Sequence, residues 1–132
     1  MSAPDFENLD LACARHAQGL VKAPCKALYK LMAASLSVLE EQGVYALFLF
    51  LDSHSDTKNA SPVRSALLEF LNANVSPTDA QKPSVATQNG YRFLNWLAED
   101  LDRLLLGQAL LRQTLVYARY RAKPDKESEE AA

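Results

Sequence analysis

Two long stretches of this 132-residue chain contain no acidic residue. They run from residue 11 to 39 and from residue 103 to 124, and both contain several lysines or arginines. The formal net charge is -2, but acids are concentrated at the two ends, so residues 11–123 carry a charge of about +4. A near-neutral protein with local basic stretches is suited to meeting a polyanion at one part of its surface.

Cysteine and long apolar runs are also scarce. The two cysteines, Cys13 and Cys25, lack CxxC spacing and are too few for a disulfide framework, which favours a reducing compartment. The strongest apolar run, residues 44–51, is much shorter than the ~20 residues that cross a membrane. Acids stand near the N-terminus, where a signal peptide carries positive charge. We therefore expect a cytoplasmic protein that has no membrane partner.

The sequence has no motif that is typical of catalysis or metal binding. Asp52, His54 and Asp56 alternate along a polar segment, but no fourth ligand follows at a recognisable spacing. A solvated loop explains them better than a metal cluster does. No serine, threonine or cysteine stands in a nucleophile motif, and no glycine-rich phosphate loop is present. We expect no enzyme, no cofactor and no metal site.

The residues that are abundant predict a helical fold. Hydrophobic residues make up 48% of the chain, glycine occurs only four times, and leucine and alanine are common. We expect an all-α, compact single-domain bundle of about five to six helices over residues 1–124. The acidic residues 125–132 contain no large apolar side chain and are expected to form a disordered tail.

Caps and apolar spacing indicate where the helices lie. Ser2 and Pro4 suit the start of a first helix, and Gly43 suits the end of a helix over residues 25–42. Ser61 and Pro62 suit the start of another. The remaining segments are a helix at residues 44–51, an irregular stretch at 72–89 and a last helical segment at 91–123.

Two of these segments carry further expectations. Residues 44–51 have no polar face, so we expect this helix to be the most buried element, at the centre of the bundle. Gly107 lies inside the last segment and either divides it into two helices or bends one. Trp96 is expected in the core, with a contact between subunits as the alternative.

The basic residues of the two acid-free stretches are candidates for RNA binding. On a helix Arg112, Arg119 and Lys123 point within about 40° of one another, and Tyr120 beside them could stack on a base. An ordinary solvated face is the alternative for each charge. The full candidate set is Arg15, Lys22, Lys26, Lys30, Arg112, Arg119, Arg121 and Lys123.

The order of several motifs resembles a known family. Arg15-His16-Ala17 is followed by Ala27-Leu28-Tyr29-Lys30-Leu31, then by the segment from Val38 to Leu49 (VLEEQGVYALFL), and finally by Tyr91-Arg92-Phe93-Leu94-Asn95-Trp96-Leu97. Over about residues 10–120 this layout resembles the small helical subunit of type III CRISPR effector complexes, of the RAMP-module, III-B-like kind. The chain departs from the family where Ala98-Glu99-Asp100 follow the Trp-Leu pair, because basic residues are common there in the family.

The resemblance implies a non-catalytic protein of antiviral defence. Such subunits stack in several copies along the duplex of guide RNA and target RNA, beside the other effector subunits that cut. Their basic side chains contact the nucleic-acid backbone, while guide pairing supplies the sequence specificity. The alternative is a helical protein–protein adaptor with no nucleic-acid role.

Overall fold

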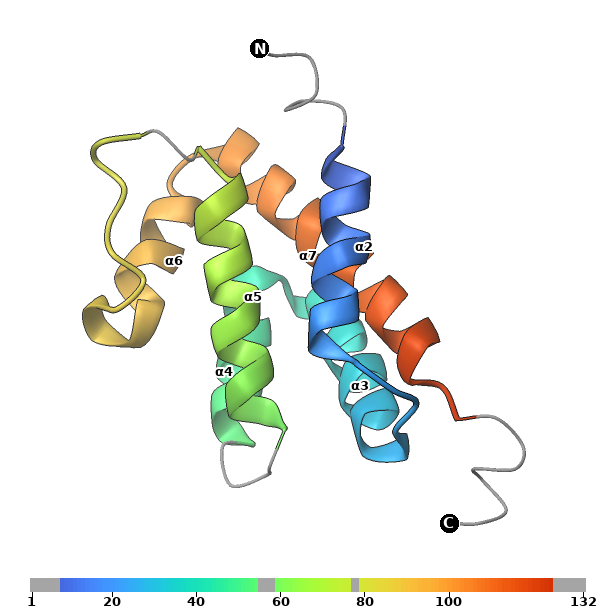
Figure 1. Ribbon diagram of the computed structural model, residues 1–132. Coiled ribbons are helices and arrows are strands. Elements are labelled where there is room, and N and C mark those ends of the chain that lie inside the picture. Colours follow the sequence, from blue (N-terminus) through green and yellow to red (C-terminus); the bar gives the residue numbers. More distant parts are fainter. Residues whose placement is uncertain (1–7, 55–58, 77–78, 125–132) are drawn as a thin grey trace.

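The described part of the chain is helical, as the composition predicts. The computed structural model describes residues 8–54, 59–76 and 79–124 (Figure 1). In chain order its helices are α2 (Leu9–Leu20), α3 (Lys26–Gln42), α4 (Val44–Ser53), α5 (Ala60–Asn74), the short 3-10 helix η1 (Thr87–Gly90), α6 (Tyr91–Ala98) and α7 (Leu101–Ala122). These residues include no strand, and the predicted compact all-α bundle is confirmed. The expected cap at Ser2 and the acidic tail lie outside the described residues.

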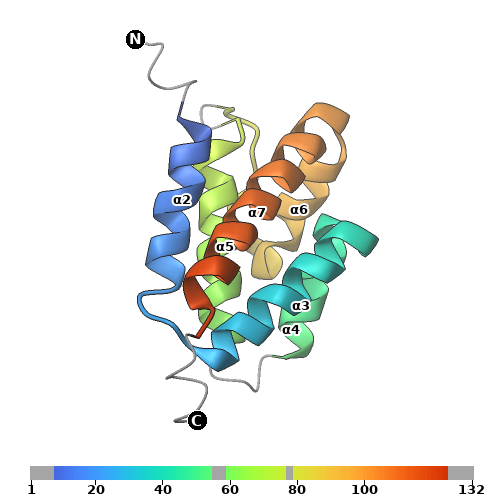
Figure 2. The same ribbon diagram turned by 90° about the vertical axis from the view of Figure 1, so that its right-hand side faces the viewer.

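The long helix α7 is the centre of the bundle. It packs along α2 on one side and α3 on the other, and Figure 2 shows it in front of α5 and α6. Its Leu111, Leu115 and Ala118 are fully buried. The three side chains recur at helical spacing, so one face of α7 closes the core against several neighbouring helices at once.

The prediction that residues 44–51 form the most buried, central element is wrong. They do form a helix, α4, but it lies at the outside of the bundle and packs mainly on α3 and α5. Leu47 is fully buried, whereas Tyr45 and Leu49 are 40% and 51% exposed. The run has more apolar residues than one buried face needs, and its surplus points to solvent.

The boundary between α3 and α4 is the one that Gly43 predicts. Gly43 has φ = 101°, which glycine adopts without the steric penalty of a Cβ atom. Its N–H donates to the Leu39 carbonyl at 3.0 Å, and its carbonyl accepts from the Leu47 N–H at 3.1 Å. One residue therefore ends one helix and begins the next.

Gly107 neither divides nor interrupts α7, which runs continuously from Leu101 to Ala122. The glycine is buried, and a Cβ atom there would lie 3.2 Å from the Cδ2 atom of Leu97. Its role is a close approach between α7 and α6. The absence of a side chain lets Leu97 pack directly against the backbone of α7.

The start of α5 and the irregular stretch differ slightly from the expected positions. The helix begins at Ala60, with Asn59 rather than Ser61 at the capping position, and it continues to Asn74. After it, residues 75–76 and 79–86 have no regular secondary structure, and η1 leads into α6. The predicted irregular stretch is therefore shorter than residues 72–89 at both ends.

Arg64 of α5 holds the ends of two other helices. Its Nε atom lies 2.6 Å from the carboxylate of Asp52 on α4, which also accepts a hydrogen bond from the hydroxyl of Tyr91 on α6. The guanidinium lies over the Tyr91 ring at 5.3 Å and donates to the Asn89 carbonyl. Asp52 thus serves as a structural ion-pair partner here.

Candidate nucleic-acid interface

The two basic stretches of the sequence meet at one end of the bundle. The Arg121 guanidinium donates from Nε to the Val21 carbonyl and from Nη2 to the Lys22 carbonyl, the latter at 3.5 Å. The Cys25 N–H donates to the Ala122 carbonyl at 2.9 Å. Residues 21–25 therefore lie against the C-terminal end of α7, as Figure 1 shows.

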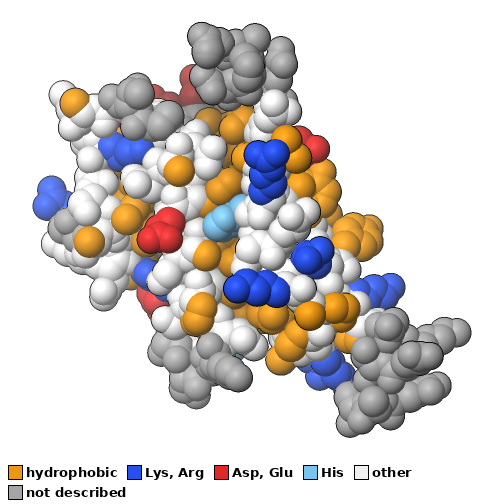
Figure 3. All heavy atoms as spheres, in the orientation of Figure 1, with side chains coloured by type: hydrophobic (Ala, Val, Ile, Leu, Met, Phe, Trp, Pro, Cys, Tyr) orange, Lys and Arg blue, Asp and Glu red, His pale blue; other side chains and the backbone are white. Residues whose placement is uncertain are grey.

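We call this region the basic end. It comprises the cationic residues that these contacts bring to the α2–α3 connection and the last turns of α7, namely Lys22, Lys26, Arg119, Arg121 and Lys123. On the face drawn in Figure 3, Lys and Arg side chains gather over the lower part of α2, the connection that follows it and the end of α7. Two groups of cations about 100 residues apart in the chain thus form one region.

The cations of the basic end differ in how firmly they are held. Lys22, Lys26 and Lys123 are exposed. Arg121 is also exposed, but its guanidinium is held by two backbone carbonyls. Arg119 is half-buried. Carbonyl partners orient a guanidinium without cancelling its charge, so Arg121 still contributes to the positive potential.

An aromatic side chain stands among these cations. Tyr120 is 67% exposed, and the Arg119 guanidinium lies 5.7 Å from the centre of its ring. Beside it, between α2 and α7, is an open hollow of about 340 Å³ whose lining includes Gln18, Tyr117 and Arg121. Aromatic rings next to cations are the combination with which proteins hold single-stranded nucleic acid.

Arg112 does not belong to the basic end, and an acid from another helix neutralises it although its own stretch contains none. Its Nε atom lies 2.5 Å from the Oε1 atom of Glu40, which α3 brings to it. Both side chains are about half exposed, at 56% and 45%. Glu40 stands one residue beyond the acid-free stretch in the sequence, so the pairing depends on how α3 packs along α7.

Arg15 and Lys30 also lie away from the basic end. Arg15 is exposed on α2, and Lys30 is exposed on α3 beside a separate hollow at the end of α4. Of the eight candidate residues, the structure thus brings five together. The signal that could have found this grouping is weak, because helix spacing relates residues on one helix and says nothing of how helices pack.

Asp10, near the start of α2, contacts α7 farther from the basic end. Its carboxylate accepts hydrogen bonds from the Tyr117 hydroxyl at 2.6 Å and the Gln113 amide at 3.3 Å. The hydrogen bond to the Asp10 carboxylate raises the pKa of the Tyr117 hydroxyl above its ordinary value. The acid that precedes the first basic stretch is therefore occupied by neutral donors.

Sequence reasoning missed an apolar feature at the other end of α7. Leu101 and Leu105 are 67% and 54% exposed. At 100° per residue they point within about 20° of Arg112, and so along the line of Arg119 and Lys123. The outward face of α7 is thus apolar at its beginning and basic at its end.

Trp96 is buried, as expected of a core residue. The Arg103 guanidinium lies 4.0 Å from the centre of its ring and donates to its carbonyl at 2.6 Å. Arg103 is therefore occupied inside the fold. The stacking of a guanidinium on an indole ring stabilises the junction of α6 and α7.

Neither a metal site nor a membrane span is found in the described ranges. Within residues 8–54, 59–76 and 79–124, no three His, Cys, Asp or Glu side chains are grouped so that they could hold a metal ion. None of the helices described is both long and apolar enough to cross a membrane. No protein-family model, curated protein or solved structure matches the chain.

Proposed function

We propose that this protein is a non-catalytic, RNA-binding small subunit of a type III CRISPR effector complex. In this proposal several copies stack along the duplex of guide and target RNA and contact its backbone. The observation that carries the RNA-binding part is the meeting of two acid-free basic stretches at one end of the bundle. The assignment to an effector complex rests on the resemblance in the order of motifs along the chain.

The chemistry of the basic end fits contacts with phosphates. Arginine can make two parallel hydrogen bonds to a phosphate, and lysine acts as a point charge beside it. Such contacts position a strand without reading its bases. Such backbone contacts are expected of a protein in a complex where pairing with the guide supplies the sequence specificity.

A fluorescence titration with single-stranded RNA over a range of salt concentrations tests the proposal. Replacing both Arg119 and Lys123 by alanine should weaken binding and flatten the log–log salt slope by up to about 1.4 units, or ~0.7 for each phosphate that is no longer neutralised. The melting temperature should change only slightly, since Lys123 is exposed and Arg119 is no more than half-buried. Arg92→Ala, which removes an exposed cation from α6, is the control and should leave the slope unchanged.

Two other outcomes would redirect the proposal. Unchanged affinity in the double variant would move the RNA-binding surface to the N-terminal set, Arg15, Lys22, Lys26 and Lys30. Unchanged affinity with both sets replaced would contradict RNA binding. The exposed Leu101 and Leu105 would then favour the second candidate function, a protein–protein adaptor, because exposed leucines in one line are typical of a protein-binding surface.

A further inference from the structure

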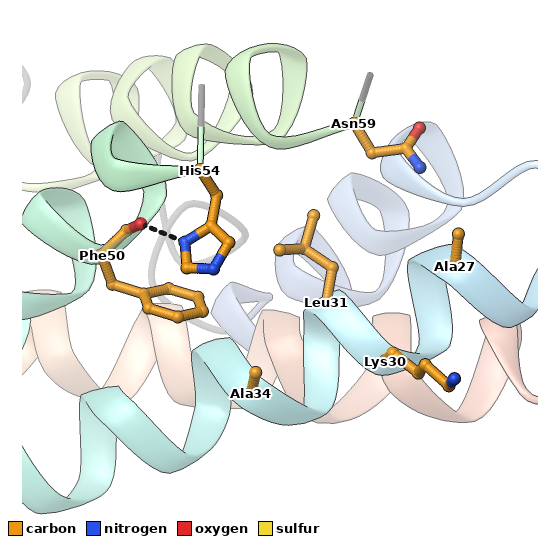
Figure 4. A pocket seen from close by; sticks show the side chains of 7 residues that line it. All are labelled: Ala27, Lys30, Leu31, Ala34, Phe50, His54 and Asn59. Atoms are coloured by element: carbon orange, nitrogen blue, oxygen red, sulfur yellow. Dashed lines mark hydrogen bonds between the residues drawn. The ribbon is translucent and has the colours of Figure 1, made fainter. Parts of the chain in front are cut away.

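A second hollow lies between α3 and the end of α4. It lies away from the basic end and beside Lys30 of the first basic stretch. It measures about 340 Å³, near the lower limit for small-molecule sites in proteins. Leu31 and Ala34 of α3 line one side, and Phe50 and His54 line the other (Figure 4). We call it the α3–α4 hollow.

The side formed by Phe50 and His54 is aromatic and held in place. The two ring centroids are 4.5 Å apart, with 46° between the ring planes. The His54 Nδ1–H donates to the Phe50 carbonyl at 3.0 Å, which orients the imidazole ring, as the dashed line in Figure 4 marks. Across the hollow, Ala34 presents only a methyl group. A flat ring could therefore enter between a small side chain and an aromatic wall.

The polar residues at the rim indicate what kind of molecule with a flat ring would fit the hollow. Lys30 lines the hollow, and Lys26 stands one turn before it on α3, about 6 Å away along the helix. Both side chains are exposed, so they are available to an anion. Asn59, at the start of α5, adds an amide that can donate and accept hydrogen bonds at a ring edge. A planar base attached to a phosphate fits the aromatic wall, the exposed lysines and the amide of Asn59.

We propose that the α3–α4 hollow binds one unpaired nucleobase of the bound RNA, with a neighbouring phosphate at Lys30. The inference rests on the proposed function and deepens it by naming a base site next to the backbone contacts. Lys26 connects the two regions, because it begins α3 directly after Cys25, whose N–H bonds to Ala122 of α7. A strand that crosses the basic end can thus continue along α3 to the hollow.

Filling the hollow tests this site while leaving the core packing intact. Ala34 is exposed, and Ala34→Phe places a ring where the base would enter. This variant should bind single-stranded RNA about tenfold more weakly, the effect of removing one stacked base. Ser37→Phe is the matched control, because Ser37 is exposed on the same helix and does not line the hollow. It should bind like the wild type, and both variants should keep the melting temperature.

A second measurement uses a mononucleotide and needs no RNA. Adding AMP to the isotope-labelled wild-type protein should shift the amide NMR signals of Phe50, His54 and Leu31, whereas inorganic phosphate alone should leave them in place. Ala34→Phe should abolish the shifts, and Ser37→Phe should retain them. Replacing Lys30 by glutamine should weaken AMP binding more than adenosine binding.

The results separate this inference from the proposed function. If the wild type binds RNA and the two phenylalanine variants bind it equally, the base site is overturned while the function stands. If the wild type binds no RNA, the proposed function fails, and the AMP titration decides the hollow by itself. Absence of AMP-induced shifts at these residues would then overturn the base site as well.

Discussion

The two ends of α7 carry opposite chemistry along the same outward line. Leu101 and Leu105, at its beginning, expose 67% and 54% of their surface. Arg119 and Lys123, at its end, lie among cations that the α2–α3 connection extends. An exposed apolar end favours contacts that salt hardly weakens, whereas a basic end favours contacts that salt weakens strongly. One helix can therefore present a protein-binding surface and a nucleic-acid-binding surface at once.

The ion pair of Arg112 and Glu40 separates the two ends. It lies about halfway along α7, and its charges cancel locally. From Arg112 to Arg119 the rise along the helix is about 10 Å, close to the Debye length at physiological ionic strength. Along α7, the positive potential of the basic end is thus limited to the last turns of the helix.

The largest expected effect comes from breaking the buried face on which both ends depend. Leu111 is fully buried, and Leu111→Asp would leave an unpaired charge in the core, at a cost of several kcal/mol. The variant should not fold stably, so both surfaces should disappear. Leu105→Asp, on the exposed line of the same helix, should melt within a few degrees of the wild type. A melting curve of Leu111→Asp that matches the wild type would contradict the core described above.

The apolar end can be removed while the basic end stays. Replacing both Leu101 and Leu105 by serine should weaken the association between neighbouring copies on a long single-stranded RNA by about 1–2 kcal/mol. Binding to a short RNA that holds one copy should be unchanged. Leu49→Ser, which changes an exposed leucine of α4, is the control. Analytical ultracentrifugation of the complexes with the long and the short RNA measures this effect. If the double variant binds the long RNA as cooperatively as the wild type does, these leucines have no role in the association.

Removing the ion-pair partner of Arg112 should extend the basic end of α7 toward its apolar end. Glu40→Gln removes its ion-pair partner and should strengthen RNA binding a few-fold, with a salt slope steeper by up to ~0.7 units. Stability should fall by no more than about 1 kcal/mol, because the pair is half exposed. Glu41→Gln removes the same charge from the neighbouring residue and should have a smaller effect. Equal salt slopes in the two variants would mean that Arg112 stays away from phosphate.

The smallest effect is expected from the acidic residues 125–132, which follow the basic end in the sequence. Deleting them removes a net charge of -3 and should strengthen RNA binding slightly. The melting temperature should stay the same, because the segment has no large apolar side chain to bury. Calorimetry on the shortened chain checks this, and a clear loss of stability would show that these residues dock on the bundle.

Local features of the fold were predictable from the sequence. The apolar spacing over residues 25–42 and the glycine after it predicted α3 and its end, because both depend on neighbours within one helical turn. The position of α4 was not predictable in this way. Its eight apolar residues indicated burial, but how many helices would cover it depends on the packing of the whole chain.

The features of the candidate interface likewise separate into those that the local sequence predicts and those that depend on packing. The sequence by itself determined that the protein is helical, where acids are absent and which cations share a face of α7. The tertiary structure decided that Arg121 reaches the carbonyls of residues 21 and 22, that Glu40 neutralises Arg112 and that Leu101 and Leu105 remain exposed. Helix formation follows from local spacing and propensity, whereas the grouping of charges requires contacts between residues far apart in the chain.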